Sequence, residues 1–190
     1  HMAMWAWSER AWGMLRVSVV SVALMALPAG APAAIAADLS DKSVEVLMNY
    51  AWAVMPKKFT KPNGEVIEVD KSKKAEIIVP KEVAREVIKV ARLTAHASIC
   101  KLEEKQAENY RTLMKREEAK KAWTDQQLLY INQLHLFTVM WLTGNVQIKQ
   151  EGDEKEVVVD EGGNAESEQT CTDAQKAKVE EQINSYVKGS

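Results

Sequence analysis

A histidine and a cysteine four positions apart are the residues best placed to do chemistry. His96 and Cys100 lie in a segment with helical periodicity, and side chains at this spacing project from one face of a helix. An imidazole nitrogen and a thiolate so arranged can bind one metal ion, or the imidazole can activate the thiolate as a nucleophile. Both chemistries require a reduced Cys100, and a metal site needs at least one further ligand.

A second histidine, His135, lies in an apolar segment beside Asn132 and Thr138. A polar cluster of this kind can hold a small ligand or tune a base near neutral pH. The alternative is a structural histidine whose ring nitrogens are satisfied by backbone groups. The third histidine, His1, belongs to a cloning remnant, so a three-histidine zinc site within one chain is excluded.

Carboxylates that precede the last predicted helix are further candidate ligands for a hard cation such as calcium: Asp153, Glu154, Glu156, Asp160, Glu161, Glu166 and Glu168. Residues 160–166 superficially resemble a calcium-binding loop, but glycine is missing at the sixth position and an acid at the twelfth. We therefore expect a solvated acidic loop over residues 150–170 and no bound metal.

The sequence contains two cysteines, Cys100 and Cys171. An oxidising compartment would join them, and closing a loop of about 70 residues would stabilise the fold by roughly 4 kcal/mol in the chain-entropy treatment. This bond would remove the thiolate that the metal and nucleophile hypotheses need. No Ser/His/Asp order, C-x-x-C pair or glycine-rich phosphate loop is present, so the sequence favours a non-enzymatic protein without a cofactor.

The first 36 residues have the order of an export signal. After the cloning remnant His1-Met2, two arginines precede an apolar run over residues 17–27, and small residues then continue to Ala36. This order predicts cleavage after Ala36 and a periplasmic location for residues 37–190.

A retained leader is the alternative to cleavage. The apolar run of about 11 residues is too short to cross a hydrocarbon layer of roughly 30 Å as a helix. Three tryptophans nearby, Trp5, Trp7 and Trp12, favour the membrane interface. An interfacial anchor with peripheral membrane contact therefore stays open as a hypothesis.

Residues 37–190 are long enough for one core and predict a single, mainly α-helical domain. We expect a bundle of about four helices with one or two small β-hairpins. Helices are expected over residues 40–55 with a start at Ser40, over 80–121 as one element of about 40 residues, over 124–143 with a stop at Gly144, and from 172 onward. Residues 57–79 predict a small sheet with a turn at Pro62-Asn63-Gly64 and a third strand at 75–79, and residues 146–159 predict a second hairpin.

Two helix starts carry the capping-box pattern, Thr124 with Gln127 and Thr172 with Gln175. The helix after Thr124 is apolar around nearly its whole circumference, so we expect it at the buried centre of the bundle or at a homo-oligomer seam. Residues 123–127, Trp-Thr-Asp-Gln-Gln, resemble the L-T-x-x-Q element of the Spy/CpxP family of periplasmic helical chaperones. This resemblance covers five residues, with Trp where the family has Leu, and implies no activity here.

Charge is segregated along the chain. Residues 56–122 carry 17 basic and 11 acidic side chains, whereas residues 123–190 carry 5 basic and 12 acidic ones. The net charge of −2 argues against a nucleic-acid binder. The far half of the predicted long helix has a thin apolar stripe, so we expect it to present a protein contact surface formed by Tyr110, Met114, Lys115, Arg116, Lys120 and Lys121.

These observations favour an exported, non-enzymatic binding or adaptor protein, chaperone-like in its use of helical contact surfaces. Its expected partner is another exported or membrane-associated protein, or a second copy of the chain. The alternative is a small-ligand or metal-binding protein that uses His96 or His135.

Overall fold

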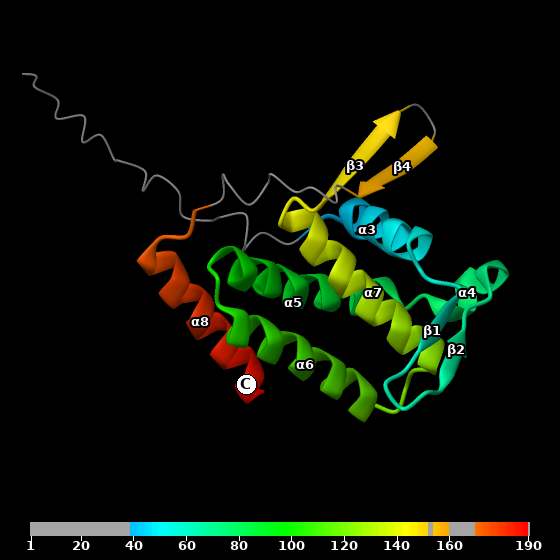
Figure 1. Ribbon diagram of the computed structural model, residues 1–190, viewed down its shortest axis with the longest axis horizontal. Helices are drawn as coiled ribbons and strands as arrows, with labels where there is room; N and C mark the ends of the chain where they lie inside the picture. Colours follow the sequence, from blue (N-terminus) through cyan, green and yellow to red (C-terminus); the bar gives the residue numbers. More distant parts are fainter. Residues whose placement is uncertain (1–38, 152–153, 160–169, 190) are drawn as a thin grey trace, which may run out of the picture. The chain divides into compact units, whose positions relative to one another are not determined.

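The computed structural model describes residues 39–151, 154–159 and 170–189. They form a mainly α-helical bundle with two small antiparallel hairpins (Figure 1), which confirms the predicted fold class. The expected leader, and residues 160–169 of the expected acidic loop, lie outside the described residues. Within the described part of the chain, no helix is both long enough and apolar enough to cross a membrane.

Helix α3 (Asp41–Ala53) begins at the predicted serine cap. The Ser40 hydroxyl oxygen accepts a hydrogen bond from the Ser43 amide at 3.2 Å, and Leu39 packs against the core beside the helix. One face of α3 is buried and carries Val44, Leu47, Met48, Tyr50 and Ala51. The helix therefore lies on the bundle through the apolar stripe that its spacing predicts.

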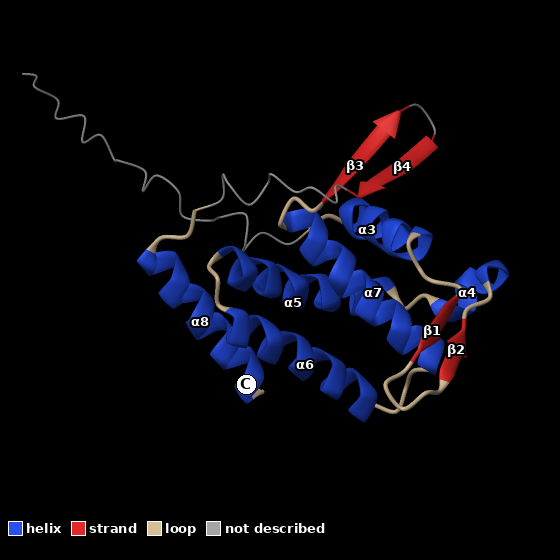
Figure 2. Cartoon of the chain, in the orientation of Figure 1, coloured by secondary structure: helices blue, strands red, loops and turns tan. Residues whose placement is uncertain are grey.

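Strands β1 (Lys58–Thr60) and β2 (Val66–Glu68) form the first hairpin (Figure 2). They run antiparallel, with Phe59 opposite Ile67. Gly64 in the connecting turn has a φ of 86°, a left-handed conformation that glycine adopts without strain. The predicted Pro-Asn-Gly turn is therefore confirmed.

The predicted third strand over residues 75–79 is wrong. A 3₁₀ turn (Lys71–Lys73) is followed there by the short helix α4 (Lys74–Ile77). The reason lies in Asp70, whose carboxylate accepts hydrogen bonds from the Ser72 amide at 2.9 Å and from the Ser72 hydroxyl at 2.6 Å. This cap starts a helical turn in place of a strand.

The predicted single helix over residues 80–121 is also wrong. Two helices, α5 (Lys81–Ile99) and α6 (Glu103–Ala119), meet at a corner. The sequence has no glycine or proline at this corner. The helical pattern of apolar residues therefore continues across it and predicts one helix. The far half of the expected helix consequently packs back on α5 and does not project.

The corner between α5 and α6 is a Schellman motif built without glycine. Lys101 takes the left-handed conformation, with a φ of 58°. The Leu102 amide donates to the Ala97 carbonyl at 2.8 Å, and the Lys101 amide donates to the Ser98 carbonyl at 3.0 Å. Ala97 and Leu102 also pack in one small apolar cluster, the contact that commonly accompanies this motif.

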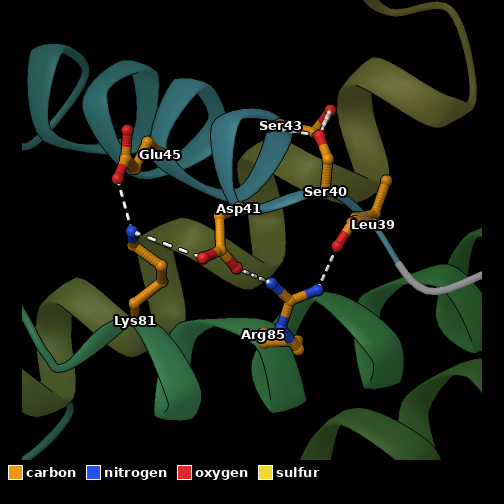
Figure 3. Close-up of polar contacts among 7 residues, drawn as sticks. All are labelled: Leu39, Ser40, Asp41, Ser43, Glu45, Lys81 and Arg85. Atoms are coloured by element: carbon orange, nitrogen blue, oxygen red, sulfur yellow. Dashed lines mark hydrogen bonds and ion pairs between the residues drawn. The ribbon is translucent and has the colours of Figure 1, made fainter.

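An ion-pair cluster joins the start of α3 to the start of α5 (Figure 3). The Arg85 guanidinium donates to the Leu39 carbonyl and to the Asp41 carboxylate, and the Lys81 ammonium pairs with Glu45. Exposed pairs of this kind contribute at most about 1 kcal/mol each. Their main effect is to fix where the chain enters the first helix of the bundle.

Helix α7 (Asp125–Leu142) is the buried centre of this chain, as one of the two predictions for it stated. It packs on α3, α5 and α6, and its capping box between Thr124 and Gln127 is formed in both directions. Its buried side chains are Leu129, Tyr130, Ile131, Leu134, His135, Phe137, Thr138 and Val139. Leu136 and Trp141 are exceptions and remain 45% and 37% exposed.

The second predicted hairpin follows α7 and is confirmed. The amide of Asn145 donates to the Met140 carbonyl at 2.8 Å, which ends the helix at the predicted glycine, Gly144. Strands β3 (Val146–Glu151) and β4 (Glu154–Val159) then pair antiparallel.

The last helix, α8 (Asp173–Lys188), lies against α5 and α6. The predicted capping box of Thr172 is formed, and Val179 and Ile183 are buried against the α5–α6 corner. The predicted disulfide joins Cys100 in that corner to Cys171 just before α8, with their Cα atoms 5.1 Å apart. The bond thus attaches the last helix to the corner of the bundle.

Candidate functional site

A cleft of about 390 Å³ opens between α5, α6 and α7. Its lining consists of Thr94 from α5, of Glu103, Gln106, Ala107 and Tyr110 from α6, and of Asn132, His135, Leu136 and Val139 from α7. Protein sites for small molecules have volumes of this order and the same mixture of apolar walls with a few polar groups. The cleft exists because α6 turns back at the Schellman corner, which places its first three turns opposite α7.

The polar floor of the cleft is a buried hydrogen-bond network centred on Thr94. Its hydroxyl lies 2.9 Å from His135 Nε2 and accepts a hydrogen bond from Asn109 Nδ2 at 2.8 Å. The same Asn109 nitrogen donates to the Val90 carbonyl at 3.0 Å. His135, Thr94 and Asn109 are each at least 97% buried, so water does not compete with these bonds.

The single hydroxyl proton of Thr94 allows two arrangements of this network. If His135 carries its proton on Nδ1, its Nε2 accepts the Thr94 proton. If Nε2 is protonated instead, it donates to Thr94, whose own proton goes to the Val90 carbonyl at 3.2 Å. The first arrangement leaves an Nδ1–H donor on His135, which is one of the residues that line the cleft.

Burial keeps the His135 ring neutral. Desolvation lowers the pKa of this histidine from its ordinary value of 6.5 to about 4. The ring of Tyr110 lies beside it, with the two ring centroids 5.1 Å apart, and burial raises the pKa of the Tyr110 phenol. Both aromatic side chains are therefore uncharged hydrogen-bonding groups at neutral pH.

A hydrogen bond between α6 and α7 holds the wall of the cleft in place. The Tyr110 hydroxyl donates to Asn132 Oδ1 at 2.7 Å, which fixes both side chains and leaves the amide nitrogen of Asn132 as a donor. Leu136, one turn further along α7, presents a large apolar side chain that nothing in the described chain fully covers. Together these groups form a surface that can contact a partly apolar molecule.

The predicted His96–Cys100 pair is not a chemical site. The sulfur of Cys100 is bonded to Cys171, so it can act neither as a metal ligand nor as a nucleophile. Burial, and then the charge of Arg92, lower the pKa of the half-buried His96. No group of three or more His, Cys, Asp or Glu side chains is placed to hold a metal ion within the described residues.

The predicted contact surface on the far half of the long helix is only partly present. Tyr110 faces the cleft, Met114 packs against the core, and Arg116 donates to the Tyr186 carbonyl of α8 at 2.6 Å. The remaining residues of that surface are exposed: Lys115, Lys120 and Lys121. The surface is thus divided between internal packing and three solvent-exposed lysines.

A second cavity, of about 420 Å³, lies between α3 and the segment before α5. Its two lysines already have partners, since Lys81 pairs with Glu45 and Lys74 donates to Asn49 Oδ1 at 2.9 Å. The Tyr130 hydroxyl in its wall donates to the Met48 carbonyl at 2.9 Å. These polar groups satisfy one another, so this cavity offers a ligand fewer hydrogen bonds than the cleft at His135.

Sequence reasoning found His135 but missed the residues that complete its site. Thr94 and Asn109 come from α5 and α6, which the sequence predicts as one straight helix. On such a helix the two side chains would not both face His135. Asn109 lies in a strongly charged stretch and has the signature of a surface residue, although it is fully buried. Only the corner at Lys101 brings it inward.

Comparisons with known proteins find no match to a family model, to a curated protein or to a solved structure. The geometry of the cleft is therefore the basis for assigning a function.

Proposed function

We propose that this chain is an exported, non-enzymatic binding protein that holds a small molecule in the cleft between α5, α6 and α7. The observation that carries the proposal is the buried Thr94–His135–Asn109 network beneath a partly apolar cleft of about 390 Å³. His135 and Thr94 of this network line the cleft, so a bound molecule can hydrogen-bond to the network at His135. Elsewhere in the network, Asn109 Oδ1 is buried with no hydrogen-bond partner among the described residues. The proposal keeps the exported, non-enzymatic class that the sequence favours and adopts its alternative function, small-ligand binding at His135.

The pairing of Thr94 with His135 does not support an enzyme. A hydroxyl nucleophile needs a base whose pKa lies near the working pH. The pKa of His135 is about 4, so its imidazole is a weak base for a hydroxyl proton. Within the described residues, no carboxylate is hydrogen-bonded to this imidazole to orient or strengthen it.

Nuclear magnetic resonance mapping with a panel of small amphipathic fragments tests the proposed function. We expect fragment-induced amide shifts at Tyr110, Asn132 and Leu136. Ala107→Trp fills the cleft and should abolish these shifts. Ala119→Trp introduces the same side chain at an exposed position of the same helix and should leave them unchanged. An unresponsive cleft across the whole panel, or shifts that persist in Ala107→Trp, would overturn the proposal.

Export is supported by the disulfide, because such bonds persist in oxidising compartments. Intact mass measured under non-reducing conditions tests this part of the proposal. A mass that corresponds to residues 37–190 with both cysteines oxidised is expected. A full-length mass with two free thiols would contradict it.

A protein partner at the end of α6 is the second candidate function. Lys115, Lys120 and Lys121 are exposed there, and the surrounding segment is the basic part of the chain. Deleting residues 105–121 would remove the buried Asn109 and Leu113, so charge reversal of the three lysines is the better test. Recovery of a partner from periplasmic extract by the wild type, and its loss with three Lys→Glu changes, is expected; equal recovery would eliminate this candidate.

A further inference from the structure

The chemical class of the ligand can be argued from the charges around the cleft. Of the described residues that line it, Glu103 alone carries a formal charge at neutral pH, because no lysine or arginine is among them and His135 is neutral. Glu103 lies in the first turn of α6, at the exposed rim. Among the described residues, no cation forms an ion pair with it. The rim of the cleft therefore presents one unneutralised negative charge.

An aromatic ring lies in the same wall. Tyr110 is two turns further along α6 than Glu103, lines the cleft and is held by its bond to Asn132. Cations are attracted to the faces of aromatic rings, and the attraction grows when the ring is fixed and partly desolvated. A carboxylate and an aromatic ring on one wall both favour a positive group in the ligand.

The opposite wall favours an apolar body. Leu136 and Val139 from α7 line the cleft. On α6, the small residue Ala107 also lines it, between Glu103 and Tyr110. Leu136 is 45% exposed in the free protein, so a ligand that covers it gains about 25 cal/mol for each Å² of apolar surface removed from water. An ion with no apolar part would gain nothing from this wall.

We propose that the cleft binds a small organic monocation, namely an amine attached to an apolar body, with its ammonium group near Glu103 and Tyr110 and its body against Leu136 and Val139. This inference rests on the proposed function, since it names the ligand class of the same site. An anionic ligand is disfavoured because it would meet Glu103, and none of the described lining residues is basic and able to offset the repulsion.

Three probes that each carry a phenyl ring on a short chain distinguish the classes: 2-phenylethylamine, 2-phenylethanol and phenylacetate, each titrated into the intact protein at pH 7 and low salt. An exposed charge pair and a cation–π contact each contribute a factor of a few. We expect the amine to bind about tenfold more tightly than the alcohol, and phenylacetate to bind most weakly. The advantage of the amine over the alcohol should shrink at 0.5 M salt, because exposed charges are then screened.

Two neighbouring carboxylates supply a matched control. Glu103→Gln should weaken binding of the amine about threefold and leave the alcohol unchanged. Glu104→Gln removes a charge from the same helical turn at a residue that does not line the cleft, and it should change neither. Equal affinities of the amine and the alcohol, or equal effects of the two variants, would overturn the ligand class and leave the binding function standing. If none of the three probes binds and the fragment panel gives no response, both the ligand class and the proposed binding function are overturned.

Discussion

At the scale of single residues, burial of His135 strongly lowers the pKa of its imidazole. Its folded pKa of about 4 lies below its ordinary value of 6.5. The unfolded chain therefore takes up the proton first as the pH falls. Stability contributed by the neutral ring is fully present above pH 6.5 and is lost progressively between pH 6.5 and 4.

Replacing His135 should remove that part of the pH dependence. Between pH 7.5 and pH 4.5 we expect the wild type to lose up to about 3 kcal/mol through this group, at 1.36 kcal/mol for each unit of pKa shift. His135→Gln retains a hydrogen-bonding group for Thr94 and has no proton to take up in this range. Urea unfolding at both pH values measures the difference.

His96→Gln is the control for this experiment, because the pKa of His96 is also lowered but its ring is only half-buried. It should leave most of the acid destabilisation in place. Parallel stability–pH curves for the wild type and His135→Gln would show that the ring is not held neutral by the fold.

At the scale of elements, the decisive feature is the break between α5 and α6. A left-handed lysine at position 101 strains the backbone, with its φ of 58°, whereas glycine adopts this conformation freely. Lys101→Gly should therefore stabilise the protein by roughly 0.5–1 kcal/mol. Urea unfolding gives the free energy of unfolding for each variant.

The same substitution inside a helix should have the opposite sign. Lys115 is exposed and lies in the interior of α6, where glycine costs about 1 kcal/mol relative to a good helix former. Lys115→Gly should therefore destabilise the protein. If Lys101→Gly destabilises it to the same extent, residues 81–119 form one continuous helix and the cleft does not exist.

Local hydrogen-bonding signals account for the parts of the fold that the sequence predicts. The caps at Ser40, Thr124 and Thr172, the stop at Gly144 and both hairpins depend on residues within a few positions of one another. The corner at Lys101 gives no such signal, because a lysine there stands where the motif usually has glycine. Its stability comes from tertiary contacts with α8 and from the disulfide.

The candidate site follows the same rule. His135 is recognisable from sequence because it is a polar residue in an apolar helix, whereas Asn109 in a charged helix is not. The burial of Asn109 depends on the angle between α5 and α6, and that angle is set by the corner at Lys101. One unpredicted backbone conformation therefore hides the site from sequence reasoning.

At the scale of the whole described domain, the basic and acidic segments meet. Lys61 pairs with Asp125 at 3.3 Å, Lys105 donates to Asn184 Oδ1 at 2.6 Å, and Arg116 donates to the last turn of α8. The charge segregation seen along the sequence thus serves packing in part. Three lysines at the end of α6 are exposed, namely Lys115, Lys120 and Lys121, and of these Lys120 also pairs with Glu117 at 2.7 Å.

The disulfide connects residues 71 positions apart and should contribute to the stability of the whole domain. Replacing both Cys100 and Cys171 with alanine should lower the free energy of unfolding by about 2–4 kcal/mol. In this variant, the amides of α8 should also exchange with solvent faster than those of α7. Without the disulfide, α8 would retain few buried anchors, chiefly Val179 and Ile183. Stability within about 0.5 kcal/mol of the wild type would contradict this role.

The central claim is that a small molecule occupies the cleft formed by α5, α6 and α7. Intermolecular nuclear Overhauser contacts between the tightest-binding fragment and the protein test it most directly. The account predicts contacts to the Leu136 and Val139 methyl groups and to the Tyr110 ring. Contacts to Met48 and Ile78, which line the other cavity, with none to the three cleft residues, would contradict it.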